Sequence, residues 1–418
     1  MHADVAVIGG GCAGIAAAVS AARAGAKVVL IDRNGLLGGQ ASGALVHSIC
    51  GLYLMRDDET RPPRPANPGF PMEVANGLIA MGGARGPVRM GRLDVLLHEP
   101  AAFAILADRL CADQPGLEVR LHTEILSVKS AGDRFLLGLN SRGQRGELEA
   151  GAVVDATGDA EVAALAGAAC TQSDRIQRPA YIIKMAGVDS NAMTANGRIR
   201  IAQALSGAVA QGALPAAALG TTFRTGVSEE EVWTTTDLAA EGFDPFDARW
   251  LSEIERQGRE ISSQVLRFLR ESVPEFRRAA ISALPGRAGI RESRRILGQY
   301  ELSADDVCNG SSFDDTVALS AWPMELRETH TGPKFRFPQE SRPCGIPIRS
   351  LRSRDEPRLF MAGRCISCSH EAQAAMRVIG TCLATGEAAG KEAADQAANP
   401  ADQTRHASRH RENSAQGG

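Results

Sequence analysis

The sequence has no hydrophobic run long enough to cross a bilayer, and it has little net charge. Its alanine-rich stretch near the N-terminus is interrupted by Arg23 and Lys27, so it does not predict a membrane span. A net charge of −3 gives no electrostatic case for binding nucleic acid or an anionic membrane. We therefore expect a small-molecule substrate as the main partner, and a homo-oligomer stays open.

The sequence also lacks a disulfide framework and a predicted metal site. Its nine cysteines are an odd number without framework spacing, and its first residues lack the basic region and cleavage site of a secretion signal. We therefore expect reduced thiols and a cytoplasmic location. Cys365 and Cys368 form a C-x-x-C pair, but no His or Cys cluster accompanies them. Two incidental small residues are the favoured interpretation, with a redox role as the alternative.

The N-terminal segment contains the pattern around which the rest of the chain is organised. Residues 3–8 form a short, Val-rich apolar run, which is typical of a buried parallel strand. Three glycines with the spacing G-x-G-x-x-G follow, and the Ala-rich residues 15–24 predict a helix. Residues 27–31 predict a second strand, which ends at Asp32, about 20 residues beyond the glycine loop. These elements occur in the order of a dinucleotide-binding unit.

Each residue of this unit has a physical role. Gly9 permits the tight turn, Gly11 lets the backbone approach a pyrophosphate, and Gly14 lets the helix pack close to the strand. The helix N-terminus offers free N–H groups and the positive end of a dipole to the phosphates. Asp32 is placed to accept hydrogen bonds from a ribose.

A second glycine pair favours FAD over NAD as the nucleotide. Gly38 and Gly39 follow the second strand and precede the small or polar residues Gln40, Ala41 and Ser42. Such a loop suggests that the ligand continues beyond the ribose, although a plain loop with two turn glycines is the alternative. No second G-x-G-x-x-G with strand context is present, so we do not expect a dedicated NAD(P)H domain.

The rest of the chain predicts an α/β fold: a Rossmann-like FAD-binding domain, with a parallel sheet and a β-meander, plus an inserted α+β substrate domain. Residues 117–160 predict the meander and a return strand that ends in A-T-G-D. Residues 246–273 predict the longest helix, ended by Pro274, and Ala372 to Ala394 predict a small-residue helix. We place the first part of the FAD domain at 1–174, the substrate domain at 175–340, the second part of the FAD domain at 341–397, and a disordered tail at 398–418.

Four segments together resemble a known family. They are GGGCAG at Gly9–Gly14, ATGD at Ala156–Asp159, GIRESRR at Gly289–Arg295 and AGRCISCSHEA at Ala362–Ala372. The chain resembles the FAD-dependent oxidoreductases of the glutathione-reductase-type flavoprotein fold, and more narrowly the group that combines these four motifs. Cys368 departs from the small non-thiol residue that similar sequences carry. The resemblance implies an FAD domain built from both chain ends, with the last A-G-R turn beside the flavin.

We expect the FAD-binding residues to come from the glycine loop, the second strand, the second glycine pair, the meander, the A-T-G-D turn and the A-G-R turn. They are Gly9, Gly11, Cys12, Ala13, Gly14, Asp32, Arg33, Gly39, Gln40, Ala41, Ser42, Ile125, Ala156, Thr157, Gly158, Gly363 and Arg364. Arg364 is expected to be a cationic donor to the cofactor, with a structural ion pair as the alternative.

The catalytic candidates are His370, Arg377 and Arg291. A helix that begins near His370 would point its N-terminus at the flavin, where hydride uptake leaves negative charge, and the imidazole would serve as the base. A capping histidine is the alternative. Arg377 lies on the same helix face and is expected to meet an anionic substrate. Arg291, with Arg294 and Arg295, is expected to capture a substrate carboxylate or FAD phosphate, or else to form salt bridges between domains.

The expected function is an FAD-dependent oxidoreductase, a dehydrogenase or oxidase that transfers a hydride from a small organic substrate to flavin, and whether that substrate is an anion stays open. A flavin-dependent monooxygenase is the alternative, and a non-catalytic flavin-binding subunit is the alternative of another class. His47 lies in the loop after the second glycine pair, but one histidine in a loop does not predict a covalent flavin link.

Overall fold

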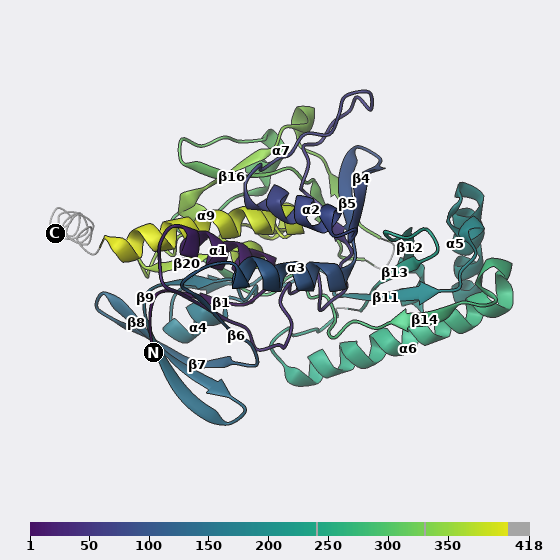
Figure 1. Ribbon diagram of the computed structural model, residues 1–418. Coiled ribbons are helices and arrows are strands. Elements are labelled where there is room, and N and C mark those ends of the chain that lie inside the picture. Colours follow the sequence, from purple (N-terminus) through teal and green to yellow (C-terminus); the bar gives the residue numbers. More distant parts are fainter. Residues whose placement is uncertain (240, 330–331, 400–418) are drawn as a thin grey trace.

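The computed structural model describes residues 1–239, 241–329 and 332–399. Figure 1 shows two regions: a sheet covered by long helices near both chain ends, and a lobe built around a smaller sheet and α6. The expected tail at 398–418 lies outside the described residues from residue 400 onward. Within the described ranges, no helix is both long and apolar enough to span a membrane.

The main sheet has the order β6-β2-β1-β9-β8-β7, and β20 also pairs with β9. Its strands are β1 (His2–Ile8), β2 (Val28–Ile31), β6 (Leu117–Arg120), β7 (Glu124–Ala131), β8 (Arg134–Ser141), β9 (Gln144–Asp155) and β20 (Leu359–Met361). β6, β2, β1, β9 and β20 pair in parallel, whereas β7, β8 and β9 form an antiparallel meander. The predicted Rossmann-like α/β fold with a meander is thus confirmed.

The register of the parallel strands brings two small-residue turns together. Ile8 pairs with Asp155, and the Ala156 N–H donates to the Ile8 carbonyl at 2.8 Å. Gly9 follows with φ +100°, and a Cβ there would lie 2.5 Å from the Ala156 oxygen. Only glycine meets both requirements at this position, the positive φ and the close approach. The glycine loop and the A-T-G-D turn therefore share one edge of the sheet.

Helices from the two chain ends cover one face of this sheet. α1 (Cys12–Arg23) packs along α9 (Ile379–Ala398), as Figure 1 shows. A Cβ at Gly386 or Gly390 would lie 2.1 Å from the carbonyl oxygen of Ala13 or Ala17. The small residues of α9 therefore let the two helices approach closely. α2 (Phe70–Ala80) and α3 (Pro100–Ala112) complete this side.

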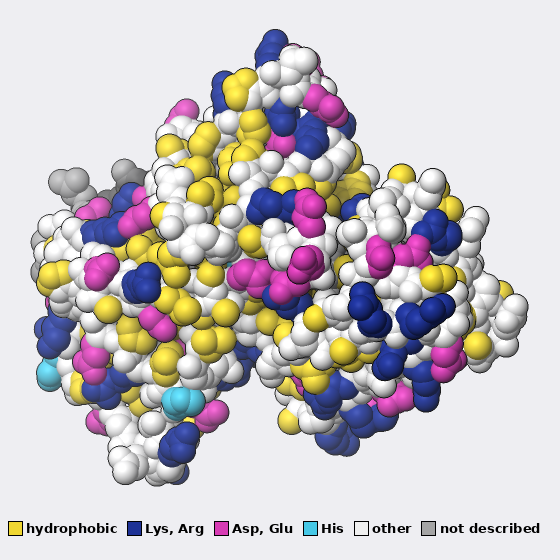
Figure 2. Space-filling model, turned by 45° about the vertical axis from the view of Figure 1, so that its right-hand side comes forward, with side chains coloured by type: hydrophobic (Ala, Val, Ile, Leu, Met, Phe, Trp, Pro, Cys, Tyr) yellow, Lys and Arg dark blue, Asp and Glu magenta, His cyan; other side chains and the backbone are white. Residues whose placement is uncertain are grey.

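The second sheet is antiparallel, with the order β12-β13-β11-β14. Its strands are β12 (Thr222–Thr225), β13 (Val232–Asp237), β11 (Ala180–Ala186) and β14 (Ala280–Ala283), and it carries α5 (Ala195–Ala210) and α6 (Ala248–Ser272). The predicted long helix is confirmed: the Asp247 side chain caps it by accepting from the Arg249 N–H at 2.8 Å, and Pro274 follows its end. In Figure 2 this lobe comes forward on the right, and a notch separates it from the rest of that face.

Several short elements complete the structure. They are β3 (Ser48–Ile49), β4 (Ala84–Met90), β5 (Leu93–His98), α4 (Glu161–Ala166), β10 (Cys170–Thr171), β15 (Arg295–Ile296), α7 (Ala304–Asn309), β16 (Thr316–Ser320), β17 (Met324–Leu326), β18 (Lys334–Arg336) and β19 (Cys344–Pro347). Ile296, Leu302 and Met324 pack in the same core as β9 and β20. The domain division at 175 and 340 stays a prediction.

The predicted C-terminal helix is divided in two. α8 (His370–Met376) ends before Arg377, and α9 starts at Ile379, so the expectation of one helix from Ala372 to Ala394 is corrected. The Gly380 N–H donates to the Cys50 carbonyl at 2.9 Å, and a Cβ at Gly380 would lie 2.6 Å from the Gly51 backbone. This contact anchors the start of α9 to a distant loop.

Candidate active site

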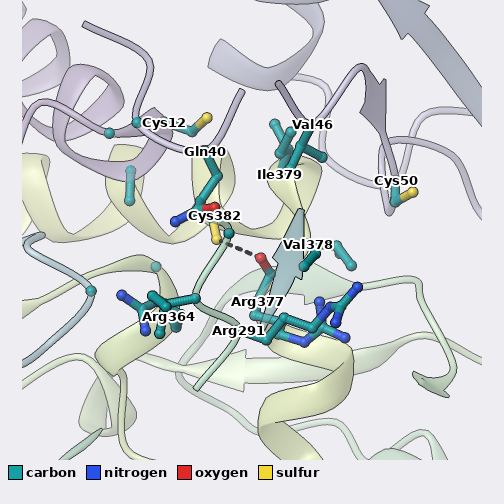
Figure 3. A pocket seen from close by; sticks show the side chains of 18 of the residues that line it. Cys12, Gln40, Val46, Cys50, Arg291, Arg364, Arg377, Val378, Ile379 and Cys382 are labelled. Carbon is teal, nitrogen blue, oxygen red and sulfur yellow. Dashed lines mark hydrogen bonds between the residues drawn. The ribbon is translucent and has the colours of Figure 1, made fainter. Parts of the chain in front are cut away.

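A cavity of about 930 Å³ extends from the glycine loop to the second sheet. Figure 3 shows Cys12 after the first glycine loop, Gln40 after the second glycine pair and the start of α9 on one side of it, with Arg291 and Arg377 below them. Val378, Ile379 and Cys382 contribute the start of α9 to its wall. The Cys382 thiol donates to the Arg377 carbonyl at 3.3 Å, the bond drawn in Figure 3.

Fourteen of the seventeen predicted FAD-binding residues line this cavity. They are Gly9, Gly11, Cys12, Ala13, Asp32, Arg33, Gly39, Gln40, Ile125, Ala156, Thr157, Gly158, Gly363 and Arg364. Gly14, Ala41 and Ser42 are not among the lining residues. A Cβ at Gly14 would lie 1.7 Å from the Gly9 oxygen, in keeping with its predicted packing role. The Ser42 hydroxyl donates to the Leu37 carbonyl at 2.5 Å and so holds the second glycine loop.

The start of α1 is an open anion cradle. Gly11 is the N-cap, no side chain caps the helix, and its first turn contains no acidic residue. A Cβ at Gly11 would meet only the Gly39 Cα, at 3.9 Å, so this position faces free space in the cavity. Unpaired N–H groups and the positive end of the helix dipole therefore face a space without side chains, which suits a pyrophosphate.

Asp32 holds the glycine loop as well as lining the cavity. Its carboxylate accepts from the Gly10 N–H at 2.6 Å and from the Asn34 N–H at 2.7 Å. The first bond fixes the turn that follows β1 against the end of β2, and the second holds the turn that follows β2. A carboxylate retains further acceptor positions, so the expected ribose contact is compatible with these bonds.

Arg287 is a cofactor candidate that the sequence patterns did not single out. A Cβ at Gly39 would lie 3.6 Å from its Nη2, so the guanidinium reaches the second glycine loop from the other sheet. Burial lowers its pKa, partly offset by the charge of Asp32. Its Nε has no hydrogen-bond partner, and it forms no ion pair with a residue in the described part of the chain. A half-buried arginine whose Nε is buried and which has no acidic partner in the described ranges indicates a place for an anion.

Arg364 is held by protein groups. Its Nη2 donates to Asp159 Oδ1 at 2.7 Å and its Nη1 donates to the Ser293 hydroxyl at 3.0 Å. Arg33 also lies 3.5 Å from the Asp159 carboxylate. The structural ion pair that was the alternative for Arg364 is therefore present, and the side chain lines the cavity from within this network.

A second group of arginines lines the cavity beyond Arg364. Arg291 and Arg327 each lie 2.8 Å from a carboxylate oxygen of Asp237. Arg327 also pairs with Glu325 at 2.7 Å. Burial raises the pKa of Glu325, but the charges of Arg327 and Arg377 outweigh it and lower that pKa to about 2. Two acidic groups thus hold this cluster.

Arg377 retains an unpaired donor within this cluster. Its Nη2 donates to the Gln177 side chain at 3.2 Å and to the Glu325 carbonyl at 3.1 Å, while its buried Nε has no partner. Burial lowers its pKa. An anion in the cavity would satisfy both the charge and the donor.

Arg224 and His47 complete this part of the cavity, and sequence reasoning assigned a role to neither. Arg224 lines the cavity from β12 and forms no ion pair with an acid in the described ranges. His47 is 3% exposed and stacks on Trp233 with ring centroids 4.7 Å apart and planes 13° apart. Arg224 and Trp233 are cross-strand partners. One pair of strands therefore supports both groups, a relationship that no local pattern signals.

His370 lies outside the lining of the cavity, which differs from its expected position over the flavin. Its Nδ1 lies 2.9 Å from Glu292 and its Nε2 lies 3.3 Å from Glu328. The helix break explains the difference: α9, not α8, presents its N-terminus to the cavity. This geometry gives no support for the predicted base role of His370 and favours the structural alternative.

The other members of the predicted basic cluster also have structural contacts. Arg295 pairs with Glu292 at 2.6 Å, and Arg294 lies 4.0 Å above the ring of Phe246. Of the three arginines, only Arg291 lines the cavity. Within the predicted cluster, Arg291 therefore faces the cavity, whereas Arg294 and Arg295 contact other parts of the protein.

The thiols of the C-x-x-C pair are buried away from the cavity. The Cys365 thiol donates to the Asp155 carbonyl at 3.4 Å, and the Cys368 thiol donates to the Ile366 carbonyl at 3.5 Å. Burial raises the pKa of Cys368 to about 12. All nine cysteines are free, and the described ranges hold no group of His, Cys, Asp or Glu suited to a metal ion.

Comparison with known families decides which cofactor this cavity takes. The sequence profile described as FAD-dependent oxidoreductase matches residues 4–403. The chain belongs to this family. It is therefore an enzyme, and its cofactor is FAD. The predicted cofactor and the oxidoreductase class are confirmed.

Solved structures show similar folds at low identity. A geranylgeranyl bacteriochlorophyll reductase-like protein from Thermoplasma acidophilum is 16% identical, with a TM-score of 0.47 over 95% of this chain and 78% of that chain. The anhydrotetracycline hydroxylase OxyS from Streptomyces rimosus is 13% identical, with a TM-score of 0.47 over 95% of this chain and 63% of the hydroxylase, less than two thirds of it. The p-nitrophenol 4-monooxygenase PnpA from Pseudomonas putida is 11% identical, with a TM-score of 0.46 over 94% of this chain and 78% of that chain.

The residues of the cavity suit FAD. The open space over Gly11 and the uncapped start of α1 fit its pyrophosphate, and the unpaired Arg287 faces the same loops. Nine arginines but only four carboxylates line the whole cavity. Arg33, Arg89, Arg291, Arg327 and Arg364 already pair with acids. Arg198, Arg224, Arg287 and Arg377 form no ion pair with an acid in the described ranges, so they are the cations left for a pyrophosphate and a second anion.

Proposed function

We propose that this FAD-dependent oxidoreductase removes a hydride from a small, anionic organic substrate that binds between the main sheet and the second sheet. The observation that carries the proposal is the set of cavity-lining arginines at the far end from the glycine loop: Arg224, Arg291, Arg327 and Arg377. Glu325 is the carboxylate that lines the cavity beside them. FAD, when bound, supplies the two-electron acceptor for the hydride.

Two of these arginines are the main candidates for the substrate carboxylate. Arg224 forms no ion pair with any acid of residues 1–239, 241–329 and 332–399, and the Nε of Arg377 is buried without a partner. A carboxylate between them would form charge-assisted hydrogen bonds with the half-buried guanidinium of Arg224 and with the buried Nε of Arg377. Arg291 and Arg327, which already pair with Asp237, would position this anion through their field.

The start of α9 is the proposed site of charge stabilisation. Its N-cap, Val378, offers no side-chain cap, and its first turn contains no acidic residue. Val378 and Ile379 line the cavity, so the positive end of the α9 dipole faces the space where the cofactor ring would lie. This assigns to α9 the role that the sequence suggested for the helix at His370.

We also propose the narrower resemblance to the glutathione-reductase-type group. Its support is that each of the four motif segments contributes residues to one cavity: Gly9, Gly11, Cys12 and Ala13, then Ala156, Thr157 and Gly158, then Gly289, Ile290 and Arg291, then Ala362, Gly363 and Arg364. These segments lie far apart in the chain, so a shared site explains why all four motifs are present.

Anaerobic reduction of the purified holoenzyme tests the proposed function. A panel of 2-hydroxy acids, amino acids and other small carboxylates is compared with the corresponding neutral amides, and flavin absorbance is followed. Bleaching by carboxylates but not by their amides is the expected result. Bleaching only by neutral compounds would contradict an anionic substrate, and NADPH-dependent oxygen uptake with hydroxylated product would favour the monooxygenase alternative.

A further inference from the structure

Among the described residues, His47 is the one histidine that lines the cavity. Its ring has no hydrogen-bond partner among these residues. Both ring nitrogens are buried without a partner, and the residue is 3% exposed. Leaving such groups unpaired in a folded protein costs free energy, and the adjoining cavity is where a ligand that completes them would bind.

The ring is held in a fixed orientation. It stacks on Trp233 with planes 13° apart, and Trp233 is itself 2% exposed. The Lys184 ammonium lies 5.1 Å from the centroid of the Trp233 ring. A ring that is locked by packing does not need to reorganise when a reacting group arrives, which is the requirement for a well-placed acid or base.

We propose that His47, and not His370, accepts the substrate proton while hydride leaves for bound FAD. In this step the substrate C–H bond breaks and its electron pair leaves with the hydride, which reduces FAD by two electrons. The same carbon carries a hydroxyl or amino group. The proton of that group passes to an imidazole nitrogen of His47, and a C=O or C=N bond forms. This inference rests on the proposed function, with Arg224 beside His47 holding the substrate anion.

Burial, more than the surrounding charges, keeps the ring of His47 neutral before substrate binds. Burial lowers its pKa to about 3, and the charges of Arg224, His98 and Lys184 act in the same direction, against the Leu45 carbonyl. A substrate carboxylate beside Arg224 would offset that charge and raise the pKa again. The imidazole would thus become more basic only when substrate is bound.

Two variants and one matched control test the proposal. His47→Asn keeps a polar planar group without a base, and His47→Phe keeps the stack on Trp233. His98→Asn is the control, because His98 is also fully buried with both ring nitrogens unpaired and its pKa lowered to about 4, but it does not line the cavity. FAD content and melting temperature are measured first for all three.

With a reducing carboxylate from the panel above, both His47 variants should slow flavin reduction by about 10²–10⁴-fold, while the Kd of the substrate changes little. The wild-type rate should fall only at a pH below the normal imidazole value of about 6.5, and this ionisation should be absent from the His47→Asn profile. His98→Asn should keep the wild-type rate above this ionisation, and the ionisation should remain in its profile because His47 is still present, shifted only by the loss of His98. Equal rates and profiles in wild type and His47→Asn would overturn the inference while leaving the proposed function intact.

A second measurement does not depend on turnover. Nitrogen NMR of ¹⁵N-histidine-labelled holoenzyme, assigned with His47→Asn, should show one non-protonated ring nitrogen for His47 at pH 7. Addition of pyruvate, as a product-like anion, should shift that signal. An imidazolium at pH 7 would overturn the inference, and a carboxylate panel that never reduces the flavin would instead count against the proposed function.

Discussion

The imidazole of His370 lies 2.9 Å from the carboxylate of Glu292, which is 0% exposed. Glu292 also pairs with Arg295 at 2.6 Å and accepts the Gln177 N–H at 3.0 Å. Breaking one partner of a buried ionic network leaves uncompensated charge. This pair therefore joins the start of α8 to the segment that carries Arg291, away from the cavity itself.

We expect this pair to make stability depend on pH. The hydrogen bond with Glu292 raises the pKa of His370, so its contribution to the free energy of unfolding is present below the unfolded value of about 6.5 and is lost as pH rises through the folded pKa. Burial raises the pKa of Glu292, but His370 and Arg295 lower it by more, so the pKa of Glu292 is below its ordinary value. The contribution of Glu292 to the free energy of unfolding is therefore lost only as pH falls. Melting temperatures from pH 5 to 9 should fall on the alkaline side in wild type and stay flatter in His370→Gln. His2→Gln, at an exposed histidine, is the control, and an unchanged alkaline slope in His370→Gln would contradict the linkage.

Gly11→Val should remove FAD and leave a folded chain. A Cβ at this position meets only the Gly39 Cα, at 3.9 Å, so the side chain would project into the cavity where the pyrophosphate is expected. Gly146→Val is the matched control, because nothing lies within 4 Å of a Cβ there and valine suits a strand. Flavin absorbance per chain and far-ultraviolet circular dichroism measure the two properties. Normal flavin content in Gly11→Val would count against this cradle.

Arg287→Ala should weaken FAD binding with little loss of folded stability. A hydrogen bond to a charged group contributes about 1.5–3 kcal/mol, which corresponds to roughly a 10- to 150-fold higher Kd. Arg287→Lys should recover only part of the affinity, because a lysine keeps the charge and loses the fork of donors. Reconstitution of the apoprotein, titrated by flavin fluorescence, gives the Kd. Arg270→Ala, at an exposed residue near the end of α6, controls for the change in net charge. Equal Kd values for Arg287→Ala and Arg270→Ala would exclude the contact.

Arg224→Gln should raise the Kd of a carboxylate substrate far more than it alters the limiting rate of flavin reduction. The reason is that Arg224 has no acidic partner in the described ranges, so its charge is free to bind the anion. By the same hydrogen-bond estimate, the expected increase in Kd is about tenfold or more. Anaerobic stopped-flow reduction at several substrate concentrations separates the two parameters. A loss confined to the limiting rate would argue against a binding role.

Gly390→Ala should destabilise the packing of α1 on α9. The added Cβ would lie 2.1 Å from the Ala17 carbonyl oxygen, which is backbone and has no rotamer to change. Overpacking of this kind costs about 1–3 kcal/mol or more. Gly207→Ala in α5 is the control, because nothing lies within 4 Å of its Cβ and alanine favours a helix. Urea unfolding midpoints should fall for Gly390→Ala and rise slightly for Gly207→Ala. Equal midpoints would show that the helices can move apart without cost.

Local patterns were sufficient for the cofactor half of the molecule. The strand, glycine loop, helix and second strand at residues 3–32 lie within one continuous segment, where residue spacing and backbone preference decide the structure. Residues 246–273 likewise carry their own helix signals, with Asp247 at the start and Pro274 at the end. These predictions needed no knowledge of distant contacts.

The substrate half depended on contacts that the sequence does not encode locally. The sequence predicts one helix over 372–394 and therefore places His370 at the flavin, but the helix is divided at Arg377 and Val378, and the start of α9 is bonded to Cys50, 330 residues away in sequence from Gly380. The cavity therefore meets α9 instead of α8, and the expected base lies elsewhere.

The sequence by itself determined the nucleotide unit, the cofactor class and the family, because these rest on short-range spacing that directly sets backbone conformation. Only the tertiary structure decided that His47, Arg224 and Arg287 face the same cavity as the glycine loop. Their neighbours come from the other sheet, and the pairing of strands and the close packing of side chains, not local propensity, bring such segments together.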